Sequence, residues 1–347
     1  MKPIAPLFDR RIPAGLFSAL ADDGAFAWVT ALAREPLTRQ RPLDLGLRKD
    51  PKTQAAHATL YVGTTKVLDI KRTAGGRFAL RSEQTGGLFG HIHPPFETAW
   101  TRPQALADLV SAMPCIRARV EAAIAVAPEE RRSEGFLQAA VAKATRAAIV
   151  PVDREIMFSW ISNPVKASGK AALRRPLDEA QRALSADYVW AAGHRPPGDK
   201  IDALALDSRG RVMVIEVKPG GQRGTAVWTP VQVGMYLQLV TAWVADDPAW
   251  AAKVLTGMAD QRRELGLTTG PLPAVGDPPE VVPVIAFGTP VERPEDAGNR
   301  FSAVRDAVMT AGIDLNALEL WAVDGETGEV RRTDAATLDN RFAARAI

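Results

Sequence analysis

The chain has 347 residues, which is enough for about two domains of roughly 150 residues and for a large buried core. Its composition, 46% hydrophobic and 24% charged, is typical of a soluble folded protein and excludes a disordered or fibrous chain. The 43 Lys and Arg residues nearly balance the 40 Asp and Glu residues, so the net charge of +3 does not by itself identify a nucleic-acid or membrane partner.

The cysteine content and the apolar runs restrict the setting in which the protein works. Cys115 is the only cysteine, so the chain can form neither an internal disulfide nor a cysteine-based zinc site. No apolar run has the length of a signal peptide or of a membrane span. We therefore expect a cytoplasmic protein with no membrane partner.

Residues 1–100 are predicted to form a small α+β module of unknown role. A helix over residues 16–34 is followed by a basic polar loop that reaches residue 54. Three short strands follow as an antiparallel meander, at residues 57–62, 66–71 and 77–82. Arg and Lys side chains on these strands could face phosphates or form an ordinary solvated sheet face, and both interpretations stay open.

Residues 101–347 are predicted to form a second domain, with a core over about residues 130–325. Helices are expected at 103–126, where Pro114 should kink or split the helix, and at 133–149. The later elements alternate, with strands at 155–161, 200–206 and 211–218, a helix at 230–244, a strand at 281–288, a helix at 300–311 and a strand at 317–323. This order predicts a mixed sheet flanked by helices, so the fold class is α/β, or α+β overall.

The most informative segment is a predicted hairpin over residues 200–218. If residues 208–210 form a three-residue loop that Gly210 closes in the left-handed region, Asp207 faces Arg211. The same register places Asp202 directly opposite Glu216, with β-carbons about 4.5–5.5 Å apart. Two carboxylates that close repel each other unless a positive group lies between them.

A divalent cation or Lys218 would relieve this repulsion. Lys218 lies on the same sheet face as Glu216, two residues further along the strand. Carboxylate ligation without Cys or a His cluster suits Mg²⁺ or Mn²⁺. Such a metal would polarise a scissile phosphate and activate water, while Lys218 would orient that water or offset negative charge.

Asp202, followed by Glu216-Val217-Lys218 on the next strand, resembles the PD-(D/E)xK nuclease superfamily. The segment Gln232-Val-Gly-Met-Tyr236 is similar to the QxxxY motif of the RecB-like exonuclease branch, and its spacing places Gln232 and Tyr236 on one helix face. The resemblance covers residues 130–290 or somewhat further. It implies a restriction-endonuclease-like αβββαβ core in which Gln232 and Tyr236 contact substrate or water.

Two further residues are weaker candidates for this site. The superfamily often takes an additional carboxylate from the first core helix, and Glu134 is the candidate ligand here, although Glu129 and Glu130 compete with it. Arg223 lies in a Gly-rich loop after Lys218 that could cradle a phosphate backbone or simply connect two elements. Ile201 stands where the family motif has proline.

The sequence therefore predicts a Mg²⁺-dependent nuclease, with DNA as the substrate that the resemblance implies. The rival interpretation is a non-catalytic nucleic-acid-binding or scaffold protein that keeps the fold and uses Asp202, Glu216 and Lys218 as a salt-bridged cluster. A third interpretation, a histidine-based metal hydrolase at His91 and His93, has alternate-residue spacing in its favour, but Gly and Pro around the pair indicate a loop.

Overall fold

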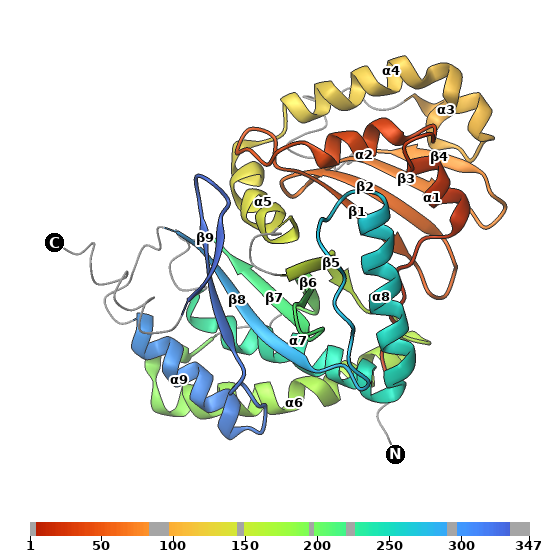
Figure 1. The fold of residues 1–347 in the computed structure, drawn as a ribbon. Coiled ribbons are helices and arrows are strands. Elements are labelled where there is room, and N and C mark those ends of the chain that lie inside the picture. The colour runs from red at the N-terminus through yellow and green to blue at the C-terminus, as the bar shows by residue number, and fades with distance from the viewer. Residues whose placement is uncertain are drawn as a thin grey trace.

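The computed structural model describes residues 5–82, 97–143, 149–193, 198–219, 226–289 and 297–333. Within these ranges the chain is a mixed α/β protein with one antiparallel and one mixed sheet (Figure 1). The first elements are α1 (Ala14–Leu20), α2 (Ala27–Arg34), β1 (Leu43–Lys49), β2 (Ala56–Val62), β3 (Thr65–Arg72), β4 (Phe78–Arg81), α3 (Thr98–Thr101) and α4 (Leu106–Ala125). The later ones are α5 (Glu129–Ala142), β5 (Ile149–Met157), α6 (Asn163–Asp187), β6 (Lys200–Asp207), β7 (Val212–Lys218), α7 (Thr229–Asp246), α8 (Pro248–Glu264), β8 (Val281–Thr289), α9 (Ala297–Thr310), β9 (Glu319–Asp324) and β10 (Val330–Thr333).

The N-terminal sheet is an antiparallel meander with the strand order β1-β2-β3-β4. The three predicted strands of this module are confirmed as β2, β3 and β4, within one residue at each end. Apolar side chains from β1 to β4 share one buried core with α1, α2 and α4, because each element is apolar on the side that faces the others. The expected antiparallel meander is therefore present, with one strand more than predicted.

The second sheet has the order β10-β9-β8-β7-β6-β5. Strands β5, β6 and β7 are antiparallel neighbours, whereas β8 pairs with β7 and with β9 in parallel. Parallel neighbours need a crossover connection, and the helices α7 and α8 supply the first crossover and α9 the second. The predicted mixed sheet flanked by helices is confirmed.

Helices cover both faces of this sheet, as the apolar character of β6 and β7 predicts. Leu204 and Val214 belong to the core that contains residues of α6, α7, α8 and α9. Ala203 and Ile215 point the other way, into a second core with α5. Figure 1 shows α5 on one side of the sheet and α6, α7 and α9 on the other.

Buried polar groups join the N-terminal module to the second sheet. Arg154 of β5 donates one hydrogen bond to Gln138 Oε1 of α5 at 2.9 Å and another to the carbonyl of Gly63 at 3.1 Å. Arg10, near the N-terminus, forms an ion pair of 2.7 Å with Asp153 of β5. Pairs that are this deeply buried fix the relative position of the segments that carry them.

The structure corrects several predicted elements. The predicted loop before residue 54 contains β1, whose alternating leucines are buried while its polar residues include the buried Asp44. The predicted helix over 16–34 is interrupted between α1 and α2 around Gly24, where a Cβ would lie 2.3 Å from the carbonyl oxygen of Ser18. α4 continues through Pro114, because proline removes a single donor and the helix surface there is exposed.

Three more elements were placed wrongly or not predicted. β5 ends at Met157 and begins at Ile149, earlier than expected, because Pro151 is tolerated in this edge strand. α6 was not predicted, although Ser162 accepts a hydrogen bond from the backbone N–H of Val165 as its N-cap. α8 was not predicted either, although Asp247 caps it in the same way.

Gly210→Ala is expected to destabilise the protein by about 1–3 kcal/mol. Gly210 has a φ of +77°, and a Cβ at this position would lie 1.8 Å from the carbonyl oxygen of Ala274. Urea denaturation measures the effect, and Gly198→Ala is the matched control, since a Cβ there meets no atom within 4 Å. Equal stability of the two variants would show that the hairpin does not require the left-handed turn.

Candidate functional site

The β6–β7 hairpin has the predicted register. The amide of Asp207 donates to the carbonyl of Arg211 at 3.1 Å, and the amide of Gly210 donates to the carbonyl of Asp207 at 2.9 Å. The strand pairing continues as far as Ala203 opposite Ile215. Asp202 and Glu216 are the next residues outward, so the two carboxylates lie across from each other at the end of the ladder.

Each side chain of this group has a defined position. Asp202 Oδ2 accepts a hydrogen bond of 2.8 Å from the backbone N–H of Val217. The side chain of Glu216 is only 2% exposed, and its Oε1 lies 2.5 Å from Nζ of Lys218. Glu216 Oε2 is buried and has no hydrogen-bond partner within the described part of the chain. One carboxylate oxygen at the centre of the group is therefore available to a ligand.

The electrostatics of the pair follow from its burial. Burial and the negative charge of Glu216 hold the pKa of Asp202 well above its usual value of 3.8, against the opposing effects of the Val217 amide and the charge of Lys218. The protein thus holds two carboxylates close together with one lysine to balance them. A divalent cation would favour the ionised form of both.

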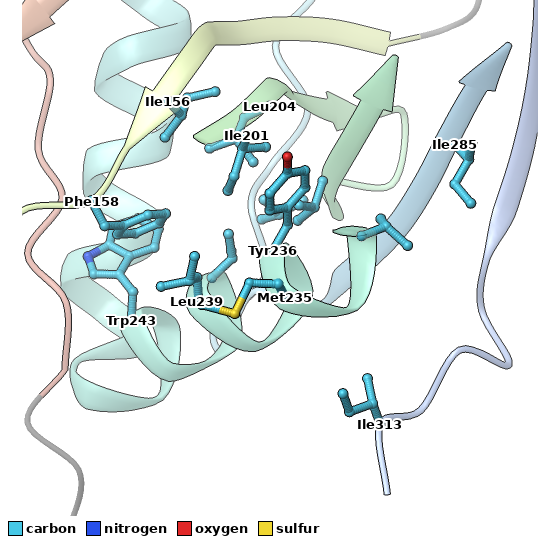
Figure 2. Close-up of a cluster of buried hydrophobic side chains, with 14 of the residues drawn as sticks. Ile156, Phe158, Ile201, Leu204, Met235, Tyr236, Leu239, Trp243, Ile285 and Ile313 are labelled. Carbon is cyan, nitrogen blue, oxygen red and sulfur yellow. The ribbon is translucent and has the colours of Figure 1, made fainter. Parts of the chain in front are cut away.

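Helix α7 brings Tyr236 to the carboxylates. Figure 2 shows Tyr236 rising from α7 with its hydroxyl towards the strands, while Met235 and Leu239 pack into the core. Burial, the negative charges of Glu216 and Asp202 and a hydrogen bond to the Glu216 carboxylate raise the pKa of Tyr236, so its hydroxyl stays protonated as a donor. Gln232 lies one turn earlier on α7 and is half-buried.

Glu155 is a member of this site that the sequence analysis missed. On β5, Arg154 pairs with Ala203 and Ile156 with Ile201, so Glu155 is level with Asp202 on the neighbouring strand. Its φ of +56° is unusual for a residue other than glycine and is a mark of local strain. A strained carboxylate within a strand was not detectable from the hydrophobic pattern.

The charge of Glu155 acts on its surroundings. Burial opposes its ionisation, but the ion pair with Lys200 and the charge of Arg154 outweigh burial, so the pKa of Glu155 lies below its usual value. Its negative charge in turn contributes to the raised pKa of Asp202. Glu155 is therefore an ionised carboxylate beside the pair.

The remaining predicted candidates stay predictions, because the structure does not describe their side chains. The helix that carries Glu134, α5, packs on the sheet face opposite to α7, and the side chain of Glu134 is not among those described. Arg223, His91 and His93 lie outside the described residues. Glu155 is the additional carboxylate that the structure does place beside Asp202.

The donor set fits a hard cation that keeps most of its water. Across the described ranges no group of three or more His, Cys, Asp or Glu side chains is arranged to hold a metal. Mg²⁺ is commonly bound by one or two carboxylates, with waters and substrate phosphates as its other ligands. Asp202 and the unpartnered Oε2 of Glu216 would supply these carboxylate oxygens.

Asp202→Asn is expected to stabilise the metal-free protein at pH 8 by on the order of 1 kcal/mol, because it removes one of two repelling charges. A raised carboxyl pKa means that the native state binds its proton more tightly than the unfolded state. The wild type should therefore lose stability relative to the variant as pH rises through the raised pKa of Asp202, and the two should converge near pH 4.

Chemical denaturation in EDTA between pH 4 and 8 measures this difference. Asp50→Asn is the control, and its expected change in stability has the opposite sign. The backbone amides of Thr53 and Lys52 outweigh burial and lower the pKa of Asp50. The Asp50 variant should be the less stable one above pH 4. A wild type more stable than Asp202→Asn at pH 8 would contradict the repulsion between Asp202 and Glu216.

Comparisons with known proteins leave the family of this chain open. No protein-family model matches the chain, and no curated protein or solved structure matches it. None of the helices in the described ranges combines the length and the apolar character that crossing a membrane requires. The functional argument therefore depends on the geometry of the carboxylate group.

Proposed function

We propose that this protein is a metal-dependent nuclease that hydrolyses phosphodiester bonds, with DNA as the expected substrate. The observation that carries the proposal is the placement of Asp202 opposite Glu216, with Nζ of Lys218 2.5 Å from Glu216 Oε1. Two carboxylates and a lysine on one sheet face are the groups that metal-assisted phosphodiester hydrolysis needs. Tyr236 of α7 adds a hydroxyl donor beside them.

The order of elements around this group supports a restriction-endonuclease-like core. Helix α5, the antiparallel strands β5, β6 and β7, helix α7 and the parallel strand β8 follow the αβββαβ order of that fold. Helix α6 is an addition between β5 and β6, and α8 between α7 and β8. In this proposal, residues 1–100 form an N-terminal module whose core also includes side chains of α4, and the catalytic core begins with α5.

Asp202 and Glu216 would hold Mg²⁺ or Mn²⁺, which supplies Lewis-acid activation of the phosphate and lowers the pKa of a bound water. Lys218 would orient the attacking water and offset the negative charge that develops on the phosphate. The protonated hydroxyl of Tyr236 would donate a hydrogen bond to a phosphate oxygen or to water. Gln232, one turn earlier on the same face of α7, would orient the nucleic-acid substrate. Lys218, Tyr236 and Gln232 would thus position the attacking water and the phosphodiester bond that it cleaves.

Cleavage of single- and double-stranded DNA and RNA by the purified protein tests the proposal. We expect cleavage with Mg²⁺ or Mn²⁺, none in EDTA, and none with Glu216→Gln, which keeps the shape of the side chain but removes a metal-binding charge. Mn²⁺ should raise the melting temperature of the wild type but not that of Glu216→Gln. Absence of both cleavage and Mn²⁺ binding in the wild type would refute the nuclease proposal.

A scaffold function is the second candidate, and the ion pair between Lys218 and Glu216 favours it. In that case Lys218 itself neutralises the buried carboxylate, and the group contributes to folding rather than to chemistry. The scaffold alternative expects no effect of Mn²⁺ and a clear loss of stability in Glu216→Ala. The nuclease proposal expects Mn²⁺ binding that Glu216→Ala abolishes.

A further inference from the structure

A small cavity lies where the N-terminal segment, the end of β1 and the end of β5 meet. Its volume is about 190 Å³. Its wall combines apolar side chains with charged and polar ones, which include Asp9, Arg10, Arg48, Lys49, Asp50 and His57. These residues come from the N-terminal module, whose role the proposed nuclease function does not explain.

Most charges in this wall already have a partner. Lys49 pairs with Asp9 at 3.0 Å, and His57 Nδ1 lies 3.1 Å from Asp69 Oδ2. Arg10 pairs with the buried Asp153. Asp50 Oδ1 accepts hydrogen bonds from two backbone amides of the following turn. The two carboxylates of the wall, Asp9 and Asp50, thus already have partners, so they repel an entering anion less than carboxylates without partners would.

Arg48 is the exception. Its Nε and Nη2 are buried, and neither has a hydrogen-bond partner among the residues that the structure describes. The guanidinium rests over the ring of Tyr61, with 5.5 Å between its carbon and the ring centroid. Stacking on an aromatic ring compensates only part of what a buried guanidinium loses when its donors stay unbonded.

Two further arginines lie close to Arg48. Arg154 stacks on the same ring at 4.9 Å, and its Nε and Nη1 are likewise buried without a hydrogen-bond partner in the described ranges, although Nη1 lies 3.6 Å from Asp44 Oδ2. Burial lowers the pKa of Arg10, and repulsion from Arg48 lowers it further, against the charge of Asp153. An anion at the cavity would relieve this repulsion.

The size and the donors of the cavity restrict what binds there. Pockets for organic ligands usually measure about 300–1,000 Å³, whereas one water takes about 30 Å³. The cavity thus has room for one small group and a few waters but not for a nucleoside. A guanidinium binds an oxyanion through two parallel N–H bonds. A phosphate carries more oxygens and more negative charge than a carboxylate, so it suits a wall that holds several cations.

We propose that this cavity binds a phosphate group, with Arg48 as its anchor. Arg10 and Lys49 supply further positive charge, and the Arg48 guanidinium turns from Tyr61 towards the cavity so that its two covered donors engage the phosphate oxygens. Free phosphate and a phosphate of a nucleic-acid strand share this chemistry. The binding itself does not depend on the proposed nuclease function.

Calorimetric titration of the full-length protein with inorganic phosphate, in EDTA and at constant ionic strength, tests the proposal. Arg48→Met removes the charge and the donors at similar volume and should weaken phosphate binding at least tenfold, as the loss of a charge-assisted hydrogen bond implies. Arg77→Met is the control, since Arg77 is an exposed residue of the connection between β3 and β4, and should change binding less than twofold. Acetate should not compete with phosphate.

The stability of the variants separates binding from a structural role. Removing a buried cation without a partner should leave the melting temperature of phosphate-free protein unchanged or raise it. Arg48→Lys keeps the charge but not the fork and should bind phosphate with intermediate affinity. No phosphate binding by the wild type, unchanged binding by Arg48→Met, or a marked loss of stability in Arg48→Met without phosphate would each overturn the proposal.

A second titration identifies the source of the phosphate. A short 5′-phosphorylated oligonucleotide is compared with its 5′-hydroxyl counterpart, again in EDTA so that no strand is cut. Tighter binding of the phosphorylated strand by the wild type, lost in Arg48→Met, supports a strand-end phosphate as the ligand. If both oligonucleotides bind equally and inorganic phosphate competes with them, the ligand is an internal phosphate of the strand. If inorganic phosphate binds but does not compete with either oligonucleotide, the ligand is the free ion.

Discussion

Lys218→Met is expected to lower the rate of metal-dependent phosphodiester cleavage by about 10²–10⁴-fold. Nζ of Lys218 lies 2.5 Å from Glu216 Oε1 and is therefore next to the oxygens that would hold the metal. At this position its charge orients water and stabilises negative charge on the phosphate, and methionine does neither. Initial rates of oligonucleotide cleavage at saturating Mn²⁺ measure the loss.

Metal binding by the same variant should change far less than the rate. The metal-binding oxygens belong to Asp202 and Glu216, and removing a nearby cation does not remove either of them. Lys253→Met is the control, because Lys253 is an exposed lysine of α8 and should leave the rate unchanged. Cleavage by Lys218→Met at the wild-type rate would show that Lys218 has no part in the reaction and would leave its ion pair with Glu216 as its role.

Asp44→Ala is expected to destabilise the protein by about 3–5 kcal/mol, since it leaves buried arginines without their counter-ion. The side chain of Asp44 is 1% exposed. Its two oxygens lie 3.6 Å from Nη1 of Arg154 and 3.4 Å from Nη2 of Arg262. Through these contacts β1 is joined to both β5 and α8, so the loss should loosen the N-terminal module from the second sheet.

Chemical denaturation at pH 7 measures this loss, and its pH dependence provides a second test. Burial opposes ionisation of Asp44, but Arg262 and Arg154 outweigh it and lower its pKa below 3.8. The stability that Asp44 contributes is therefore present above its unfolded pKa, and it is lost as pH falls through its lower pKa in the folded state. The difference in the free energy of unfolding between the wild type and Asp44→Ala should narrow only below about pH 4.

Asp22→Ala is the matched control for this prediction. Asp22 also pairs with an arginine, Arg34 at 2.7 Å, but its side chain is 79% exposed. An ion pair in water contributes little, so the change in stability should stay within about 0.5 kcal/mol. Similar losses in Asp22→Ala and Asp44→Ala would show that burial does not decide the contribution of these pairs.

The central hairpin could be predicted from the sequence because all its determinants are local. The loop at residues 208–210 needs a residue in the left-handed region, and Gly210 provides it. Alternation along β6 and β7 then fixes which side chains share a face, so Asp202, Glu216 and Lys218 were placed together before the fold was known. The resemblance to the QxxxY motif singled out Tyr236, and helical spacing then placed it on one face of α7 with Gln232.

Elements whose polar residues find distant partners could not be predicted in this way. β1 resembled a loop because Asp44 and Arg48 interrupt its leucines, and only the tertiary structure supplies Arg262 and Tyr61 as their neighbours. The same holds for Glu155, whose left-handed conformation is imposed by its position beside β6. Sequence patterns report burial of apolar groups and say little about buried charges.

The sequence by itself thus determined the carboxylate pair, its lysine and the order of the strands β5 to β9, because turn chemistry and hydrophobic periodicity act over a few residues; it did not reveal α6 or α8. The tertiary structure alone decided that α5 covers the face opposite to α7 and that Glu155 lies beside Asp202. It also decided that Arg48 lines a cavity with β5. These outcomes depend on which segments meet across the chain, and long-range packing, rather than local propensity, selects them.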